Sequence, residues 1–211
     1  MPLRELIRPT LRTIRWGGLA GSALPAAFVV WHFHNQPDPG ASTSAFGLRV
    51  AAVMLALGLA FVLDDPTEDT TGSTPVSVLA RRGLRVGLTL PPMLLFWLLL
   101  RAYAGGAHPT WPFVLEAIAF AAVGLAGAAL GSRLMSDRLG GPAGAGSVVI
   151  VALVAALLPW ADGLLTRTPG TPPHAGSSVW WETVIVVSML VWWRSSSIPT
   201  PSFRRRLSRA C

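Results

Sequence analysis

The sequence predicts an all-α, polytopic integral membrane protein with about six transmembrane helices and both termini in the cytoplasm. Apolar residues make up 52% of its 211 residues, charged residues make up 13%, and the mean hydropathy is +0.52. A water-soluble domain of this length would carry more charge and fewer apolar residues. Because lipid offers no partner to backbone polar groups, apolar runs of about 20 residues are expected to cross it as helices.

Six apolar segments are long enough, or nearly long enough, to cross a bilayer. They are residues 17–33, 46–63, 84–103, 111–130, 147–160 and 179–193. Asp162 shortens the fifth segment and Glu182 lies near the start of the sixth. A four-helix protein, in which these two segments are re-entrant or interfacial, therefore remains an alternative. The predicted organisation is a basic segment over 1–16, a transmembrane domain over 17–194 and a basic tail over 195–211.

The first segment carries arginines at spacings of three or four residues. These are Arg4, Arg8, Arg12 and Arg15. With the apolar residues beside them they predict an amphipathic helix in the cytoplasmic interface, and a solvated basic tail fits equally well because Pro9 interrupts the pattern. No small-x-small cleavage pattern follows the first apolar segment, so we expect that segment to stay in place as a signal anchor.

The arginines predict the orientation of the chain, since the sequence contains no lysine. With the N-terminus in the cytoplasm, 14 of the 17 arginines lie inside and 3 lie outside, namely Arg49, Arg101 and Arg167. This asymmetry follows the positive-inside rule. It also accounts for the net charge of +7 without a nucleic-acid partner.

Several kinds of chemistry are excluded by missing residues. Without lysine the chain has neither a P-loop nor a Schiff-base lysine, so no nucleotide or pyridoxal cofactor is expected in it. Cys211 is the single cysteine, which excludes an internal disulfide and a thiolate metal cluster. Motifs such as GxSxG and HExxH are missing, so an enzyme is disfavoured.

The four histidines all fall on the outer side in this topology. They are His32, His34, His108 and His174, with Asp38 following the first pair. Such a set has the chemistry to bind zinc or copper. The first pair lies beside Trp31 and Phe33, however, where amphipathic rings collect at a membrane interface, so no metal site is predicted.

Small residues and prolines predict two features of helix packing. Gly124, Gly127 and Gly131 form a small-residue surface at helical spacing, which predicts close packing against another helix. Pro91 and Pro92 lie in the middle of segment 84–103 and are expected to kink or break that helix.

Four ionisable residues are predicted at membrane depth, towards the outer leaflet. They are Arg101, Glu116, Asp162 and Glu182. A charged, unpaired side chain in hydrocarbon is costly, so intramembrane acids are candidate functional residues. We expect Arg101 to pair with Glu116 across the third and fourth helices, and a purely structural ion pair or a snorkelling side chain is the alternative.

The loop between the second and third apolar segments is the other candidate site. It begins with an acidic part that includes Asp64 and Asp65, continues through Pro75 and ends at Arg81, Arg82 and Arg85. It is interpreted either as an exposed loop with orienting arginines or as a docking element whose charges meet a soluble partner.

The layout resembles the membrane subunits of type-2 ABC exporters, especially small actinobacterial permease-like proteins. The similarity lies in six helices with both ends inside, a basic segment before the first, and an inner loop of the form acid-rich, T-P-V-x-x-L-A-R-R, here residues 64–85. The resemblance implies a homo- or heterodimeric permease in the bacterial inner membrane, with ATP bound by a separate ATPase subunit against that loop. It also implies an amphipathic or lipid-like substrate. The outer loops are shorter than in that family. A non-transporting accessory, assembly or immunity membrane protein, and then a membrane enzyme, are the alternatives.

Overall fold

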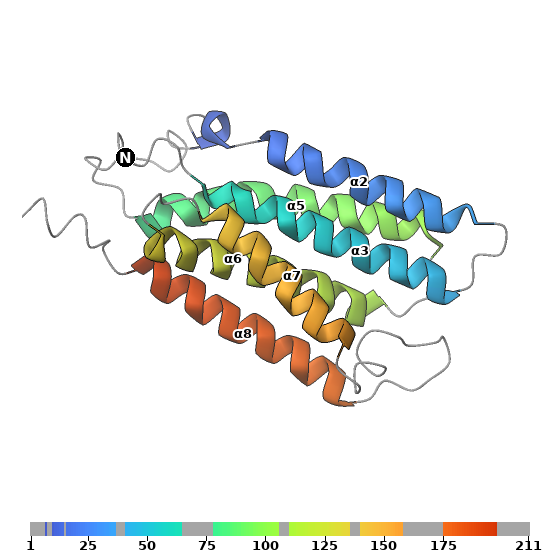
Figure 1. The fold of residues 1–211 in the computed structure, drawn as a ribbon. Helices are drawn as coiled ribbons and strands as arrows, with labels where there is room; N and C mark the ends of the chain where they lie inside the picture. The colour runs from blue at the N-terminus through green and yellow to red at the C-terminus, as the bar shows by residue number, and fades with distance from the viewer. Residues whose placement is uncertain are drawn as a thin grey trace, which may run out of the picture.

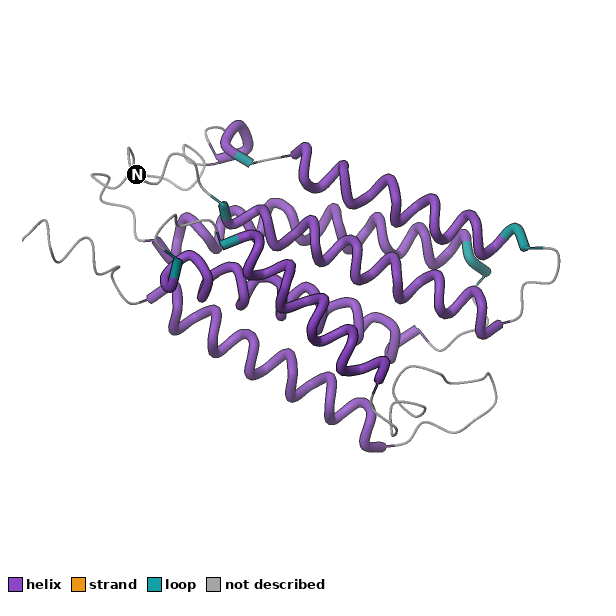
Figure 2. Tube along the Cα trace, in the orientation of Figure 1, coloured by secondary structure: helices purple, strands orange, loops and turns teal. Residues whose placement is uncertain are grey.

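The computed structural model describes residues 7, 10–14, 16–36, 41–64, 78–105, 110–135, 140–157 and 175–197. Every regular element among them is helical (Figures 1 and 2). The elements are α2 (Trp16–His34), α3 (Ala41–Ala60), the 3-10 turn η1 (Phe61–Leu63), α5 (Val78–Tyr103), α6 (Thr110–Leu134), α7 (Gly141–Leu157) and α8 (Ala175–Ser197). The fold class predicted from composition is therefore confirmed as all-α.

The six long helices run alternately in opposite directions (Figure 1). We call the end of the bundle at which α2, α5 and α7 begin the N-terminal end, and the opposite end the far end. Each helix overlaps one of the six predicted apolar segments. The fifth and sixth segments form α7 and α8, which lie along the bundle like the other helices.

Two central helices organise the core. α3 packs against α2, α5, α6 and α7, while α6 packs against α3, α7 and α8. Within their apolar stretches 61% of the residues are buried in both α3 and α6, against 22% in α5. Among the largest fully buried side chains are Leu48 and Leu59 of α3 and Phe120 of α6. The outer helices therefore turn much of their surface away from the protein.

The glycines of α6 lie where the prediction of close packing requires them. A methyl group on Gly127 would approach the Cα of Gly144 in α7 to 3.0 Å, and one on Gly131 would overlap the Cβ of Ala143. Such contacts are possible only because the two backbones nearly touch. Close packing of this surface is confirmed. Its main partner is α7, and at Gly124 it also meets α3, where an added methyl group would lie 3.1 Å from the backbone oxygen of Ala56.

The expected break in the third apolar segment is wrong, because α5 is one continuous helix of 26 residues through Pro91 and Pro92, while the alternative of a kink stays a prediction. Both prolines are exposed, so their rings displace no neighbouring helix. On either side of them Thr89 and Trp97 are buried and anchor α5 to the bundle. Proline is tolerated in apolar helices when the surrounding packing holds both halves in line.

Three helical stretches are long and apolar enough to cross a membrane. They are Thr43–Leu63, Val78–Tyr103 and Phe113–Leu134, and Gly141–Leu157 is apolar but shorter. The outer helices also expose large apolar side chains along their lengths, including Leu24, Phe28, Leu95, Leu99, Ile150, Leu153, Val186 and Leu190. A soluble monomer rarely exposes apolar surface of this extent, whereas lipid accommodates it. The structure is that of a membrane protein.

Exposed aromatic side chains gather at both ends of the bundle. Trp16 and Trp193 lie at the N-terminal end, and Trp31, Tyr103 and Trp111 lie at the far end. Tryptophan and tyrosine concentrate at the two membrane interfaces, where an apolar ring meets water. This distribution is the one expected of a bundle whose axis crosses a bilayer.

Candidate functional site

A buried ion pair joins the two central helices. The Nε atom of Arg49 on α3 lies 3.1 Å from Oε1 of Glu116 on α6. The same N–H donates a hydrogen bond of 3.1 Å to Oε2. The two side chains are 16% and 4% exposed, respectively. Glu116 is thus enclosed in the bundle, while the Arg49 side chain still reaches its surface.

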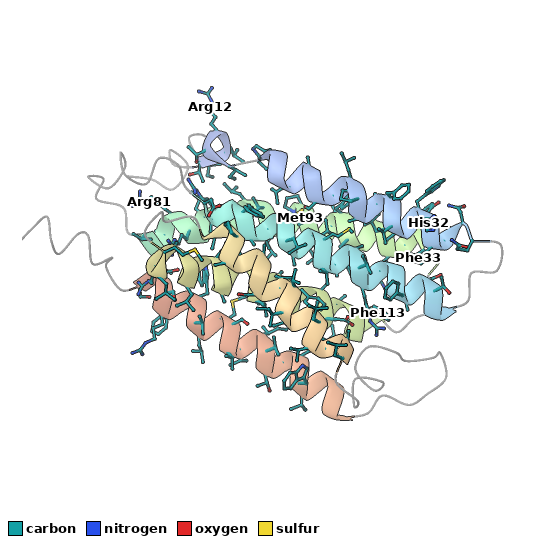
Figure 3. The ribbon with its side chains drawn as sticks, viewed as in Figure 1. Arg12, His32, Phe33, Arg81, Met93 and Phe113 are labelled. Carbon is teal, nitrogen blue, oxygen red and sulfur yellow. The ribbon has the colours of Figure 1, made fainter. Side chains whose placement is uncertain are left out.

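The face of α6 that carries Glu116 is turned towards the core. Phe113, Glu116 and Phe120 follow one another at spacings of three and four residues, so they share one side of the helix, and all three are buried. The guanidinium carbon of Arg49 lies 5.1 Å from the centre of the Phe113 ring, close enough for a cation–π contact. Phe120 in turn packs edge-on against Trp181 of α8 at 5.4 Å. Apolar and aromatic side chains therefore surround the pair (Figure 3 labels Phe113).

The pair is incompletely satisfied. Oε1 of Glu116 is buried and accepts no hydrogen bond from the described residues. Arg49 engages Glu116 through Nε alone, and its two Nη atoms form no hydrogen bond with the described part of the chain and are not among the buried atoms. A full two-bond contact between guanidinium and carboxylate would be more stable. Donors of Arg49 therefore remain directed away from Glu116.

The predicted partner of Glu116 is wrong. We expected Arg101, but Arg101 lies in the last turn of α5, which packs against α3, η1 and α8. α3 packs directly against α6, and it is α3 that supplies the partner, Arg49. Glu182 has an exposed side chain on α8, and Asp162 lies outside the described residues. The structure therefore does not bring Glu116 and Glu182 into one polar cluster.

Arg49 is the residue that the sequence analysis missed as a site residue. It was assigned only to the outer group of orienting arginines. The available signal was its position inside the apolar segment 46–63, where a charge needs a partner on a neighbouring helix. Sequence alone did not show which helix is the neighbour.

Asp64, the first residue of the predicted coupling loop, is buried at the N-terminal end. Its Oδ1 accepts a hydrogen bond of 2.7 Å from the backbone N–H of Gly141, at the first position of α7. A carboxylate there satisfies a free N–H and complements the helix dipole. Gly141 is required because a Cβ at that position would overlap the ring of Phe61. Asp64 therefore fixes the start of α7 to the end of η1.

Two of the three predicted coupling arginines are also buried. Arg82 donates from Nη2 to Oγ of Ser132 on α6 at 2.8 Å, and Arg85 donates from Nη2 to Oγ1 of Thr13 at 3.2 Å. Both are turned into the bundle, where they hold helices together, and neither presents a charged surface to a partner. Arg81 is half-buried at the same end (Figure 3). Asp65 and Pro75 lie outside the described residues.

The N-terminal segment packs against the bundle over residues 10–14. Residues 10–13 are helical, Ile14 is buried among apolar side chains of the helices, and Nε1 of Trp16 donates to the backbone oxygen of Leu11 at 2.9 Å. Arg12 points away from the bundle (Figure 3). Residues 10–14 are therefore packed against the helices and are not a solvated tail, while the amphipathic helix over residues 1–16 stays a prediction. Arg4, Arg8 and Arg15 lie outside the described residues.

The described histidines take part in an aromatic and polar cluster at the far end. The ring of His34 is tilted against that of Tyr103 with ring centres 4.9 Å apart, and Nε2 of His32 lies 3.1 Å from Nε2 of Gln36. Nδ2 of Asn35 donates to Oη of Tyr103 at 3.3 Å, which links α2 to α5. No three metal-binding side chains gather within the described ranges. Asp38, His108 and His174 lie outside them.

Comparison of the chain with protein-family models, with curated proteins and with solved structures finds no match. Its function is therefore inferred from its own residues.

Proposed function

We propose that this chain is the six-span membrane subunit of an ATP-binding-cassette exporter. It works as a homo- or heterodimer in the bacterial inner membrane and moves an amphipathic or lipid-like substrate, while a separate subunit hydrolyses ATP. The observation that carries the proposal is the buried Arg49–Glu116 pair. Ionisable side chains inside a membrane-embedded bundle are rare, and they are candidates for a substrate pathway.

The distribution of arginines supports an orientation with both termini in the cytoplasm. Among the described residues the N-terminal end carries Arg12, Arg81, Arg82, Arg85, Arg133 and Arg194. The far half carries Arg49 and Arg101. Because positive residues are retained on the cytoplasmic side, the N-terminal end faces the cytoplasm.

Cysteine labelling tests this orientation, because Cys211 is the only natural cysteine. In intact cells a membrane-impermeant maleimide should leave Cys211 unmodified. In a Cys211→Ser background it should modify Trp111→Cys at the far end and spare Met135→Cys at the N-terminal end; both positions are exposed, at 63% and 48%.

Permeabilised cells provide the control, since all three cysteines should react there. Labelling of Met135→Cys in intact cells would overturn the orientation. Labelling of Cys211 without labelling of Met135→Cys would overturn the six-span topology.

The ATPase assignment rests on the family resemblance and on the missing P-loop. Asp64, Arg82 and Arg85 are buried inside the bundle. Among the described coupling residues, half-buried Arg81 is therefore the one that we propose to lie at the contact with the ATPase. An ATPase held there would sit on the end of the bundle that carries the arginines, where charge complementarity favours an acidic docking surface.

Co-purification tests the partner. A Walker-motif ATPase should co-purify from native membranes with the wild-type chain, and Arg81→Glu should reduce its yield severalfold because the charge at the contact is reversed. Arg12→Glu is the matched control: it makes the same charge change at the same end of the bundle, on an exposed side chain.

Thermal unfolding in detergent should show that Arg81→Glu and Arg12→Glu are equally stable, so that a difference in ATPase yield reflects the contact and not unfolding. Equal ATPase recovery with Arg81→Glu and Arg12→Glu would remove Arg81 from the contact. Failure to recover any nucleotide-binding chain would remove the exporter assignment.

One observation favours a second candidate, a non-transporting accessory membrane protein. Three of the predicted coupling residues, Asp64, Arg82 and Arg85, form internal contacts at the N-terminal end, as expected of a bundle held rigid there. In that case no ATPase would co-purify while the cysteine labelling pattern stayed the same.

A further inference from the structure

The guanidinium of Arg49 is held on one edge and on one face, which leaves a specific part of it available. Glu116 takes the Nε edge, and the ring of Phe113 lies 5.1 Å from the central carbon. The two Nη atoms form no hydrogen bond with the described residues and are not among the buried atoms. A planar guanidinium in this state presents a pair of parallel donors, which match two oxygens of a phosphate or carboxylate.

We propose that Arg49 binds the phosphate group of a ligand through its Nη atoms, and that a membrane phospholipid supplies this group. Glu116 is a positioning residue, which fixes the guanidinium through Nε and does not touch the ligand. The proposal depends on the bundle lying in a membrane but not on the chain being an exporter.

The depth of Arg49 favours a lipid phosphate. Arg49 follows Thr43, where the apolar stretch of α3 begins, by six residues, which corresponds to about 9 Å at about 1.5 Å per residue. Long arginine side chains extend from such a depth to the interface. The phosphates of lipid headgroups lie directly outside the hydrocarbon region, so the Nη atoms and a headgroup phosphate are at compatible levels.

The charges favour a ligand that binds reversibly. Arg49 and Glu116 together are neutral, so Glu116 weakens the attraction of Arg49 for an anion. Oε1 of Glu116 is buried and accepts no hydrogen bond from the described residues, so the negative charge of Glu116 is not offset by further donors there. Removing the charge of Glu116 while keeping its acceptor should therefore strengthen phosphate binding. A purely structural ion pair would not show this behaviour.

The test is native mass spectrometry of the full-length chain released from detergent and titrated with lipid. Dioleoyl phosphatidylethanolamine should bind the wild-type chain, and dioleoylglycerol, which has the same acyl chains without phosphate, should not. Arg49→Gln should weaken phospholipid binding at least about tenfold, as expected for loss of charge-assisted hydrogen bonds. Glu116→Gln should strengthen it severalfold.

Two further variants keep the outcome interpretable. Arg49→Gln leaves Glu116 buried without a cation, so the double variant Arg49→Gln/Glu116→Gln, which buries no charge, should fold and should also lose phospholipid binding. Arg101→Gln, at the same end of the bundle and with the same loss of charge, should bind as the wild type does.

Inorganic phosphate distinguishes the two sources of the phosphate group. If it displaces the phospholipid at millimolar concentration, the site serves soluble phosphate compounds; if it does not, the lipid is the ligand. Equal binding of phosphatidylethanolamine and dioleoylglycerol, unchanged binding by the double variant, or weaker binding by Glu116→Gln would each overturn the phosphate site.

Discussion

Replacing Arg49 by leucine should lower the free energy of unfolding of the bundle by about 3–5 kcal/mol, because it leaves the carboxylate of Glu116 buried without its cation. The Glu116 side chain is only 4% exposed, so it cannot move to water without disturbing α6. Glu116→Leu should be less damaging, since the long Arg49 side chain is 16% exposed and can extend to the interface. Arg49→Leu should therefore lower the free energy of unfolding more than Glu116→Leu does, because Glu116 is the more deeply buried of the two side chains.

The double variant Arg49→Leu/Glu116→Leu should recover most of the loss, or exceed the wild type, because two apolar side chains of similar volume bury no charge. Thermal or denaturant unfolding in detergent, followed by circular dichroism, measures all three variants. The coupling energy of the double-mutant cycle should then be large and of the sign expected for a direct contact.

Glu182→Leu provides the matched control for this series. Glu182 is also an acid in an apolar helix, but its side chain is exposed, so the change should stay within about 0.5 kcal/mol of the wild type. If the two single variants at Arg49 and Glu116 were additive in the double variant, the two side chains would not form the contact described here.

The positions of the helices could be predicted from the sequence because they depend on local properties. In lipid, an apolar segment forms a helix because the helix pairs its backbone N–H and C=O groups with one another. The observed helices overlap all six predicted segments. The continuity of α5 through Pro91 and Pro92 could not be predicted, since it depends on how the neighbouring helices pack against the residues on either side of the prolines.

The pairing of charges could not be predicted for the same reason. Arg49 and Arg101 were both assigned to the outer half, and the choice between them as a partner for Glu116 depends on α3, not α5, packing directly against α6. At the other end of the bundle, the sequence predicted that Asp64, Arg82 and Arg85 lie in an exposed loop. The residues that bond to them are far away in the sequence, namely Gly141, Ser132 and Thr13, respectively. Long-range contacts of this kind leave no periodic pattern.

Gly144 should be the most sensitive glycine of α7 to the addition of a single methyl group. A Cβ at this position would overlap the backbone oxygen of Gly124 and would lie 2.9 Å from the backbone nitrogen of Ala128. These are backbone atoms of α6, so a flexible side chain cannot move aside, and α6 and α7 would have to separate. Overpacking of this kind costs about 1–3 kcal/mol.

Gly146→Ala is the matched control, two residues away in the same helix. No atom lies within 4 Å of the position that its Cβ would take, and the residue is exposed. Alanine also forms helices better than glycine, by up to about 1 kcal/mol, so this variant should be neutral or slightly stabilising. The difference in unfolding free energy between the two alanine variants, measured in the same detergent, isolates the contact between α6 and α7. Equal stability would mean that the backbones of α6 and α7 do not approach each other closely at Gly124 and Gly144. The close packing of these two helices would then be wrong.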